Sequence, residues 1–151
     1  MASPTPAPTP IDVFIDSSVF FAAVYSAAGS ARDLFAAAQG GRIALVLSDY
    51  VLAETERNLF ASAPRALPAF RRLLGSVPYA LSNPTRTMVI DTARVVVAKD
   101  APIIAAARAA EVQLVATYDR KDLLSKRQPI FDAFGVTVAT PDEILARIEH
   151  P

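Results

Sequence analysis

Short apolar runs alternate along the chain with longer segments in which apolar residues recur every three or four positions. The runs Ile11–Ile15, Ile43–Leu47 and Gln113–Thr117 are long enough for strands buried on both faces and too short for helices. A last strand is predicted over 136–139. The segments with helical spacing are 31–39, 49–60, 64–75, 103–110 and 141–148. This alternation predicts an α/β fold with a central parallel sheet covered by helices on both faces.

Two segments leave the secondary structure open. Residues 77–81 are compatible with a short strand, and Asn83-Pro84 indicates a turn, but residues 87–97 mix β-branched and charged side chains and fit either a helix or a strand. Residues 125–132 fit a polar loop or a short helix.

Polar residues mark the expected helix starts. Ser30, Ser48 and Asp100 stand where N-caps belong, and Pro102 follows in the first turn of its helix. Thr140-Pro141-Asp142-Glu143 has the pattern of a capping box with proline at the first helical position. These signals place the predicted helix starts within a residue or two.

The first ten residues differ in kind from the rest. Prolines at positions 4, 6, 8 and 10 alternate with small residues, a pattern that excludes a helix and gives little to bury. We predict a disordered arm over residues 1–10 and one domain over residues 11–151, which agrees with a length of 151 residues.

Composition excludes several classes of function. The chain has no cysteine, which rules out thiolate metal sites and suits a reducing compartment, so we expect a cytoplasmic protein. Its 15 basic and 15 acidic residues balance, which argues against a general electrostatic coat on nucleic acid. No apolar run approaches the roughly 18 residues of a membrane span. The only histidine is His150, at the extreme C-terminus, so a Ser-His-Asp site is not expected.

Acidic residues far apart in the sequence are predicted to meet at one edge of the sheet. Asp16, Asp119 and Asp122 follow strands, Asp100 opens a helix, and Glu54 lies on the helix after the second strand. Ligands bind in open α/β sheets at the carboxyl ends of the strands. Like charges at that edge require a cation, and an oxygen-only ligand set suits Mg²⁺ or Mn²⁺. Taken singly, Asp16 also fits a helix cap and Glu54 a solvated helix face, and we interpret Asp122 as a cap.

Four stretches together resemble the PIN domain, the endoribonuclease fold of many prokaryotic toxin–antitoxin toxins (VapC-like). They run Val13-Phe14-Ile15-Asp16-Ser17-Ser18-Val19, Ser48 to Glu54, Lys99-Asp100-Ala-Pro-Ile-Ile with the alanines after it, and Leu114 to Leu124. The resemblance covers the chain from about residue 11 to 149, apart from 76–98. It implies a three-layer α/β/α sandwich and a metal-dependent ribonuclease that hydrolyses RNA phosphodiester bonds.

The resemblance also implies roles for individual residues. The acidic quartet of the family falls on Asp16, Glu54, Asp100 and Asp119. Asp16 would be the central metal ligand, Asp100 and Asp119 would complete its shell, and Glu54 would position water or a second ion. Thr117 matches the usual Ser/Thr two places before the last acid, and Ser18 stands where members often have asparagine.

Basic residues flank the acidic turn. We expect Arg120 and Lys121 to contact substrate together with Ser18 and Thr117. Lys126 and Arg127 follow them, and for this basic group an RNA-backbone contact and an ordinary solvated loop both remain open.

The expected partners are an RNA substrate, a protein antitoxin and a second copy of the chain, since dimers are common in such families. The main alternative is a catalytically idle PIN-like module that binds RNA or protein. A further alternative is a phosphoesterase for a small phosphate ester, although the Asp-x-Asp nucleophile motif is missing because Ser18 takes the second position.

Overall fold

The computed structural model describes residue 4 and residues 9–149, and a five-stranded sheet lies at its centre. All paired strands are parallel. Across the sheet the order is β3 (Tyr79–Leu81), β2 (Ile43–Leu47), β1 (Ile11–Ile15), β4 (Leu114–Ala116) and β5 (Thr137–Ala139). The central strand β1 places Val13 opposite Leu45 of β2 and opposite Leu114 of β4.

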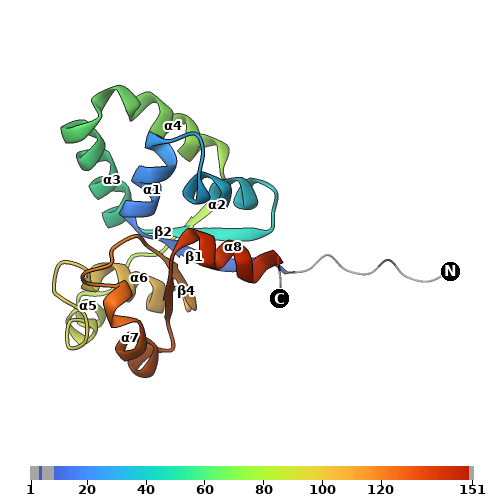
Figure 1. Cartoon of the computed structure of the whole chain (residues 1–151). Coiled ribbons are helices and arrows are strands. Elements are labelled where there is room, and N and C mark those ends of the chain that lie inside the picture. Colours follow the sequence, from blue (N-terminus) through green and yellow to red (C-terminus); the bar gives the residue numbers. More distant parts are fainter. Residues whose placement is uncertain (1–3, 5–8, 150–151) are drawn as a thin grey trace.

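Helices cover both faces of the sheet, which confirms the predicted three-layer α/β/α sandwich. Helices α1–α4 lie on one side and α5–α7 on the other (Figure 1), while α8 packs against α2. Their bounds are α1 (Ser17–Tyr25), α2 (Ser30–Gln39), α3 (Asp49–Ser62), α4 (Leu67–Ser76), α5 (Arg86–Thr92), α6 (Ala101–Ala109), α7 (Arg127–Phe134) and α8 (Pro141–Glu149), with short 3₁₀ turns η1 (Pro64–Ala66) and η2 (Leu124–Lys126). Within the described ranges, none of these helices has the length and apolarity needed to span a bilayer.

The order of the strands creates a switch point between β1 and β4. From β1 the chain moves outward to β2 and β3, then returns to β4 on the other side of β1 and continues outward to β5. The connections that leave β1 and β4 therefore diverge, and such a divergence opens a crevice at the carboxyl ends of the two strands, where ligands bind in folds of this class. Asp16 and Thr117 stand directly after these two strands.

The hydrophobic core fixes the positions of α1 and α6 relative to the carboxyl ends of β1 and β4. Phe20 of α1 is fully buried between Phe35 and Phe70, with ring centroids 5.0 and 5.1 Å away. Helix α6 is buried on nearly all sides, as its run of alanine and isoleucine predicts. Because α1 and α6 both begin at the crevice, their packing positions the residues at their first turns.

The ambiguous segment 76–98 contains the edge strand β3 and the short helix α5. Thr85 caps α5 by accepting a hydrogen bond from the Met88 N–H at 3.2 Å. Arg108 of α6 donates to the Thr92 hydroxyl and to the Asp91 carboxylate, at 2.8 and 2.9 Å. These contacts from α6 stabilise the helical conformation of α5. Local sequence propensity cannot reveal them, because the two helices are brought together only by the fold.

Ser48 and Asp100 occupy the N-cap positions of α3 and α6 as predicted, but the helix predicted over 64–75 is divided into η1 and α4, and α4 begins at Leu67. Ser48 caps α3 through the Val51 N–H at 3.2 Å, and Glu143 reaches back to the Thr140 N–H as a capping box requires. Ser30 is not a cap, because the helix begins at Ser30 itself and Gly29 takes the N-cap position. The polar segment 125–132 becomes η2 and α7. Most of the predicted arm, and His150, lie outside the described residues.

Candidate functional site

Asp16 is a buried carboxylate with every oxygen engaged. It caps α1, where Oδ1 accepts from the Ser17 N–H at 2.7 Å, while Oδ2 accepts from the Thr117 and Ser18 hydroxyls at 2.6 and 2.9 Å. Only 5% of the residue is exposed. Burial raises the pKa of Asp16, and the hydrogen bonds from Thr117, Ser18 and Ser17 oppose that rise. The interpretation of Asp16 as a helix cap is therefore correct, and capping fixes its carboxylate at the carboxyl end of β1. Its role as a metal ligand stays a prediction.

The hydroxyls of Ser18 and Thr117 join the ends of β1 and β4. Besides donating to Asp16, Ser18 accepts from the Tyr118 N–H, and Thr117 accepts from the Asp119 N–H, both at 3.0 Å. The loop after β4 is thereby fixed to the first turn of α1. These contacts hold Asp16 and Asp119 in place, while a substrate contact of Ser18 or Thr117 stays a prediction.

Glu54 leans from α3 toward the same edge of the sheet. Its Oε1 accepts from the Ser17 hydroxyl at 2.6 Å, and the side chain is half-buried, unlike an ordinary solvated helical glutamate. A hollow of about 410 Å³ is lined by Asp16, Ser17, Ser18, Phe21, Glu54, Asn58, Ser62 and Asp100. Three of the four predicted acids therefore face one hollow.

A second group of acids adjoins this hollow. Asp100, Asp119 and Asp122 each offer one carboxylate oxygen, and these oxygens lie within 4.8 Å of one another. The Lys99 Nζ lies 3.0 Å from Asp100, 3.0 Å from Asp122 and 3.7 Å from Asp119. Asp100 belongs to both the hollow and this cluster. It is the N-cap residue of α6, yet its carboxylate makes no capping hydrogen bond.

Charge and burial shift the pKa values in this cluster. Burial raises the pKa of Asp100 to about 6, although Lys99 opposes the shift. The carboxylates of Asp122 and Asp100 raise the pKa of Lys99 above its ordinary value. Without a cation, this set of acids is costly to ionise, and Lys99 supplies that cation here.

The interpretation of Asp122 as a helix cap is wrong. The residue before η2 is Leu123, which makes no side-chain cap. Instead Asp119 accepts a hydrogen bond from the Asp122 N–H at 3.0 Å, so Asp119 organises the turn and Asp122 projects its carboxylate toward Lys99. An acid three places after another is also a capping pattern, so the sequence alone cannot separate the two roles.

The donor set fits a hard divalent cation. The charged groups that could coordinate a metal ion at the site are all carboxylates, and carboxylate oxygens are ligands that Mg²⁺ and Mn²⁺ prefer. The Lys99 ammonium is a stand-in for that cation, since it lies against all three clustered acids. The residues that could hold a metal are therefore Asp100, Asp119 and Asp122, with Asp16 and Glu54 on the adjoining wall.

Of the basic residues around the acidic turn, Arg120 and Lys121 are exposed, and they make no ion pair with any residue that the structure describes. Arg127 instead forms two hydrogen bonds with Glu143 of α8, at 2.8 and 2.6 Å. Arg127 is thus engaged in holding α7 to α8, whereas Arg120 and Lys121 remain open to an anion.

Replacing Arg127 by methionine is expected to lower the free energy of unfolding at pH 7 by at most about 1 kcal/mol, because the two side chains are 43% and 42% exposed. Arg127 is the main cause that lowers the pKa of Glu143 to about 2. A carboxyl group whose pKa is lower in the folded protein than in the unfolded chain stabilises the fold at every pH above the unfolded-state pKa. This stabilisation is lost as the pH falls through the pKa of the folded protein.

The difference between wild type and Arg127→Met should therefore shrink as the pH falls from 4.5 to about 2. Urea denaturation at a series of pH values measures it. An undiminished difference at the acid end would show that Arg127 acts through packing and not through Glu143.

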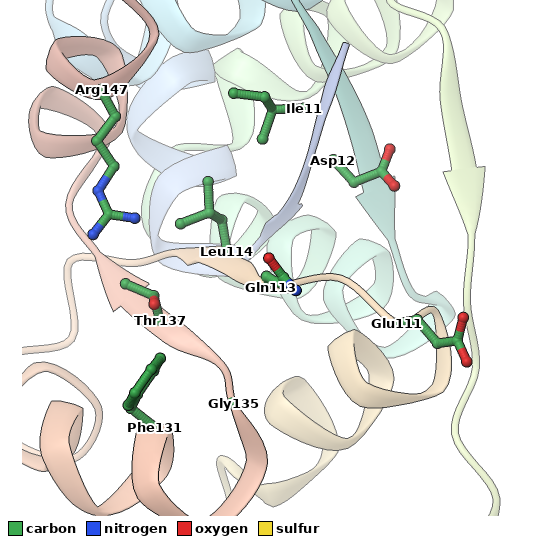
Figure 2. Close-up of a pocket in the computed structure, with 9 residues that line it drawn as sticks. All are labelled: Ile11, Asp12, Glu111, Gln113, Leu114, Phe131, Gly135, Thr137 and Arg147. Carbon is green, nitrogen blue, oxygen red and sulfur yellow. The ribbon is translucent and has the colours of Figure 1, made fainter. Parts of the chain in front are cut away.

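A larger hollow, of about 620 Å³, lies at the opposite edge of the sheet. Figure 2 shows Arg147 of α8 on one side of it, Asp12 and Glu111 on the other, and Leu114 between them. It surrounds the amino ends of β1, β4 and β5, away from the crevice at the switch point. Its acids do not form a metal cluster of the kind found at Asp100.

Comparison with known proteins identifies the family. A family model described as the PIN domain matches residues 12–121. The matched range includes four of the acids described above, Asp16, Glu54, Asp100 and Asp119, and it ends one residue before Asp122. It also includes β4 and all of β1 except Ile11. The chain therefore belongs to the PIN domain family, as its sequence motifs predicted. A search of the curated proteins finds no match.

Solved structures share the fold. PAE2754 from Pyrobaculum aerophilum matches with a TM-score of 0.66 at 17% identity, over 93% of this chain and 97% of that chain. VapC20 from Mycobacterium tuberculosis, described as a sarcin-ricin loop cleaving toxin, matches with a TM-score of 0.50 at 22% identity, over 72% of this chain and 91% of its own. At these identities the likeness establishes the fold alone.

Proposed function

We propose that this protein is a metal-dependent endoribonuclease that hydrolyses RNA phosphodiester bonds. The observation that carries the proposal is the convergence of Asp100, Asp119 and Asp122 within 4.8 Å, next to the hollow that holds Asp16 and Glu54. Membership of the PIN family supports it, since PIN domains are generally metal-dependent nucleases. Mutually repelling acids that serve no core packing are expected only where a cation must bind.

Asp16, Asp100 and Asp119 are the proposed metal ligands, and we add Asp122 because its carboxylate lies beside those of Asp100 and Asp119. A bound Mg²⁺ or Mn²⁺ would polarise a phosphate oxygen and lower the pKa of a bound water. The Ser18 and Thr117 hydroxyls hold the Asp16 carboxylate in one orientation. Glu54, aligned by Ser17, is placed to accept a proton or to orient water in the hollow.

Exposed cations beside the acidic turn support a polyanionic substrate. Arg120 and Lys121 would bind backbone phosphates on either side of the cleaved bond, which gives affinity without reading sequence. We also propose that the Ser18 and Thr117 side chains contact the RNA substrate. The description of VapC20 as a sarcin-ricin loop cleaving toxin favours RNA as the substrate class, a toxin role and a protein antitoxin as partner. A cytoplasmic setting is part of the same proposal. A homodimer is also proposed, because dimers are common in families of this kind.

The test is cleavage of a mixed RNA pool with Mn²⁺ or Mg²⁺, by wild type, by protein in EDTA and by Asp100→Asn. Wild type should cut, and the other two should lose at least about 99% of the rate, because ligand loss removes the cation. Asp132→Asn, an exposed acid on α7, is the matched control and should cut normally. A folded wild type that neither binds Mn²⁺ nor cuts RNA would favour the idle binding module.

A further inference from the structure

Lys99 covers the acidic cluster from the solvent side. Its Nζ makes contacts of 3.0, 3.0 and 3.7 Å with Asp100, Asp122 and Asp119. The Lys99 side chain is 64% exposed, whereas the three acidic side chains are 13%, 16% and 21% exposed. The ammonium thus enters from water at the end of a flexible stem, while the carboxylates beneath it are held by the fold.

The ammonium and a metal ion would need the same oxygens. The three carboxylate oxygens lie within 4.8 Å of one another, which leaves room for one cation between them. Lys99 adjoins Asp100 in the sequence, so its ammonium stays within reach of the cluster even when it swings away. The Asp119 carboxylate is fixed by the hydrogen bond that it accepts from the Asp122 N–H, and Asp100 is positioned at the start of the buried helix α6.

We propose that Lys99 is an internal counter-ion that competes with the divalent metal for the Asp100–Asp119–Asp122 cluster. Lys99 stabilises the metal-free protein by neutralising the cluster, and metal binding displaces its ammonium into solvent. The residue therefore weakens metal affinity and makes occupancy of the site depend on metal concentration. This inference rests on the proposed function, because it assumes that the cluster is the metal site.

The first test is calorimetric titration of Mn²⁺ into the protein without RNA. Lys99→Met keeps the length of the side chain and removes the charge, and it should bind Mn²⁺ at least tenfold more tightly than wild type. Lys99→Arg keeps the charge and should bind like wild type. Lys121→Met removes an exposed charge from the same turn, and its affinity should stay within about twofold, because exposed charges are screened by salt.

Thermal denaturation supplies the second half of the prediction. In EDTA, Lys99→Met should melt below wild type and below Lys121→Met, since its acids repel one another unopposed. Addition of Mn²⁺ should raise its melting temperature more than that of wild type, because a tighter ligand stabilises the native state more.

A third measurement uses the wild-type chain, so it does not depend on a variant that folds. Acetylation of lysines by an activated ester, followed by mass spectrometry, reports whether the Lys99 amine is engaged. Adding Mn²⁺ should increase acetylation of Lys99 relative to Lys121 within the same molecule. Unchanged or reduced acetylation of Lys99 would overturn the competition.

The outcomes separate this inference from the proposed function. If wild type and Lys99→Met bind Mn²⁺ equally, or the variant binds more weakly, Lys99 is not a competitor although the metal site stands. If only Lys99→Met binds Mn²⁺, the competition is supported in its strongest form. If neither binds Mn²⁺, both the inference and the metal-dependent function fail.

Discussion

Replacing Asp16 by asparagine is expected to abolish RNA cleavage and yet leave the metal-free protein at least as stable as wild type. The rate should fall at least about a hundredfold, since even residues that only support metal ligands commonly cost 10–100-fold. Burial raises the pKa of Asp16. The ionised carboxylate therefore destabilises the folded state above the pKa of the unfolded chain, and a neutral side chain of the same shape removes that cost.

Asparagine can also keep the local hydrogen bonds. Its amide oxygen would accept from the Ser17 N–H, and its NH₂ group would donate to the Ser18 and Thr117 hydroxyl oxygens, which now donate to Asp16. A hydroxyl oxygen can accept two hydrogen bonds, so their existing contacts with backbone N–H groups survive.

The measurements are the cleavage rate with Mn²⁺ and the melting temperature in EDTA. Asp12→Asn is the control, because Asp12 is an exposed acid on the same strand at the opposite edge of the sheet. A variant at Asp16 that still cuts at the wild-type rate would remove Asp16 from the site. A variant that loses its fold together with its activity would contradict the expected stability.

Truncating Phe20 to alanine is expected to cost about 3–5 kcal/mol of unfolding free energy. Phe20 is fully buried and contacts the rings of Phe35 and Phe70, so the substitution leaves a cavity where α1, α2 and α4 meet. A domain of this kind has only about 5–15 kcal/mol in total. Because the Phe20 N–H also bonds to the Asp16 carbonyl at 3.2 Å, the first turn of α1 should loosen with the core.

The urea midpoint measures this effect. Phe60→Ala is the matched control, since Phe60 is 72% exposed on α3 and its loss should change stability by no more than about 0.5 kcal/mol. Equal effects at both positions would mean that the aromatic contacts around Phe20 are not a cooperative part of the core.

The strands of the central sheet could be predicted because burial on both faces leaves a direct signal. Ile11–Ile15 and Ile43–Leu47 are uninterrupted or nearly uninterrupted apolar runs, and both form strands with those bounds. The segment that could not be assigned, 87–97, lacks such a signal. Its helix depends on Arg108, which donates to Thr92 from another element of the fold.

The acids of the site could be predicted as a set, but their grouping could not. The position of each acid after a strand or at a helix start follows from local pattern. Two features depend on side-chain directions in the folded protein: Asp122 joins Asp100 and Asp119, and the Asp16 carboxylate accepts hydrogen bonds from Ser18 and Thr117. Lys99 was missed as a functional residue for the same reason, because a lysine beside an aspartate is an unremarkable pair in sequence.

The pairing of β1 with β4 has a consequence for when the site comes into existence. The Asp16 N–H bonds to the Ala116 carbonyl at 3.0 Å, and the Thr117 hydroxyl that fixes its carboxylate lies 101 positions later in the chain. A polypeptide still emerging from the ribosome contains Asp16 and Glu54 long before it contains Thr117 and Asp119. Such distant pairings form late in folding. The growing chain therefore has no assembled site until Thr117 and Asp119 have been synthesised and β4 has paired with β1.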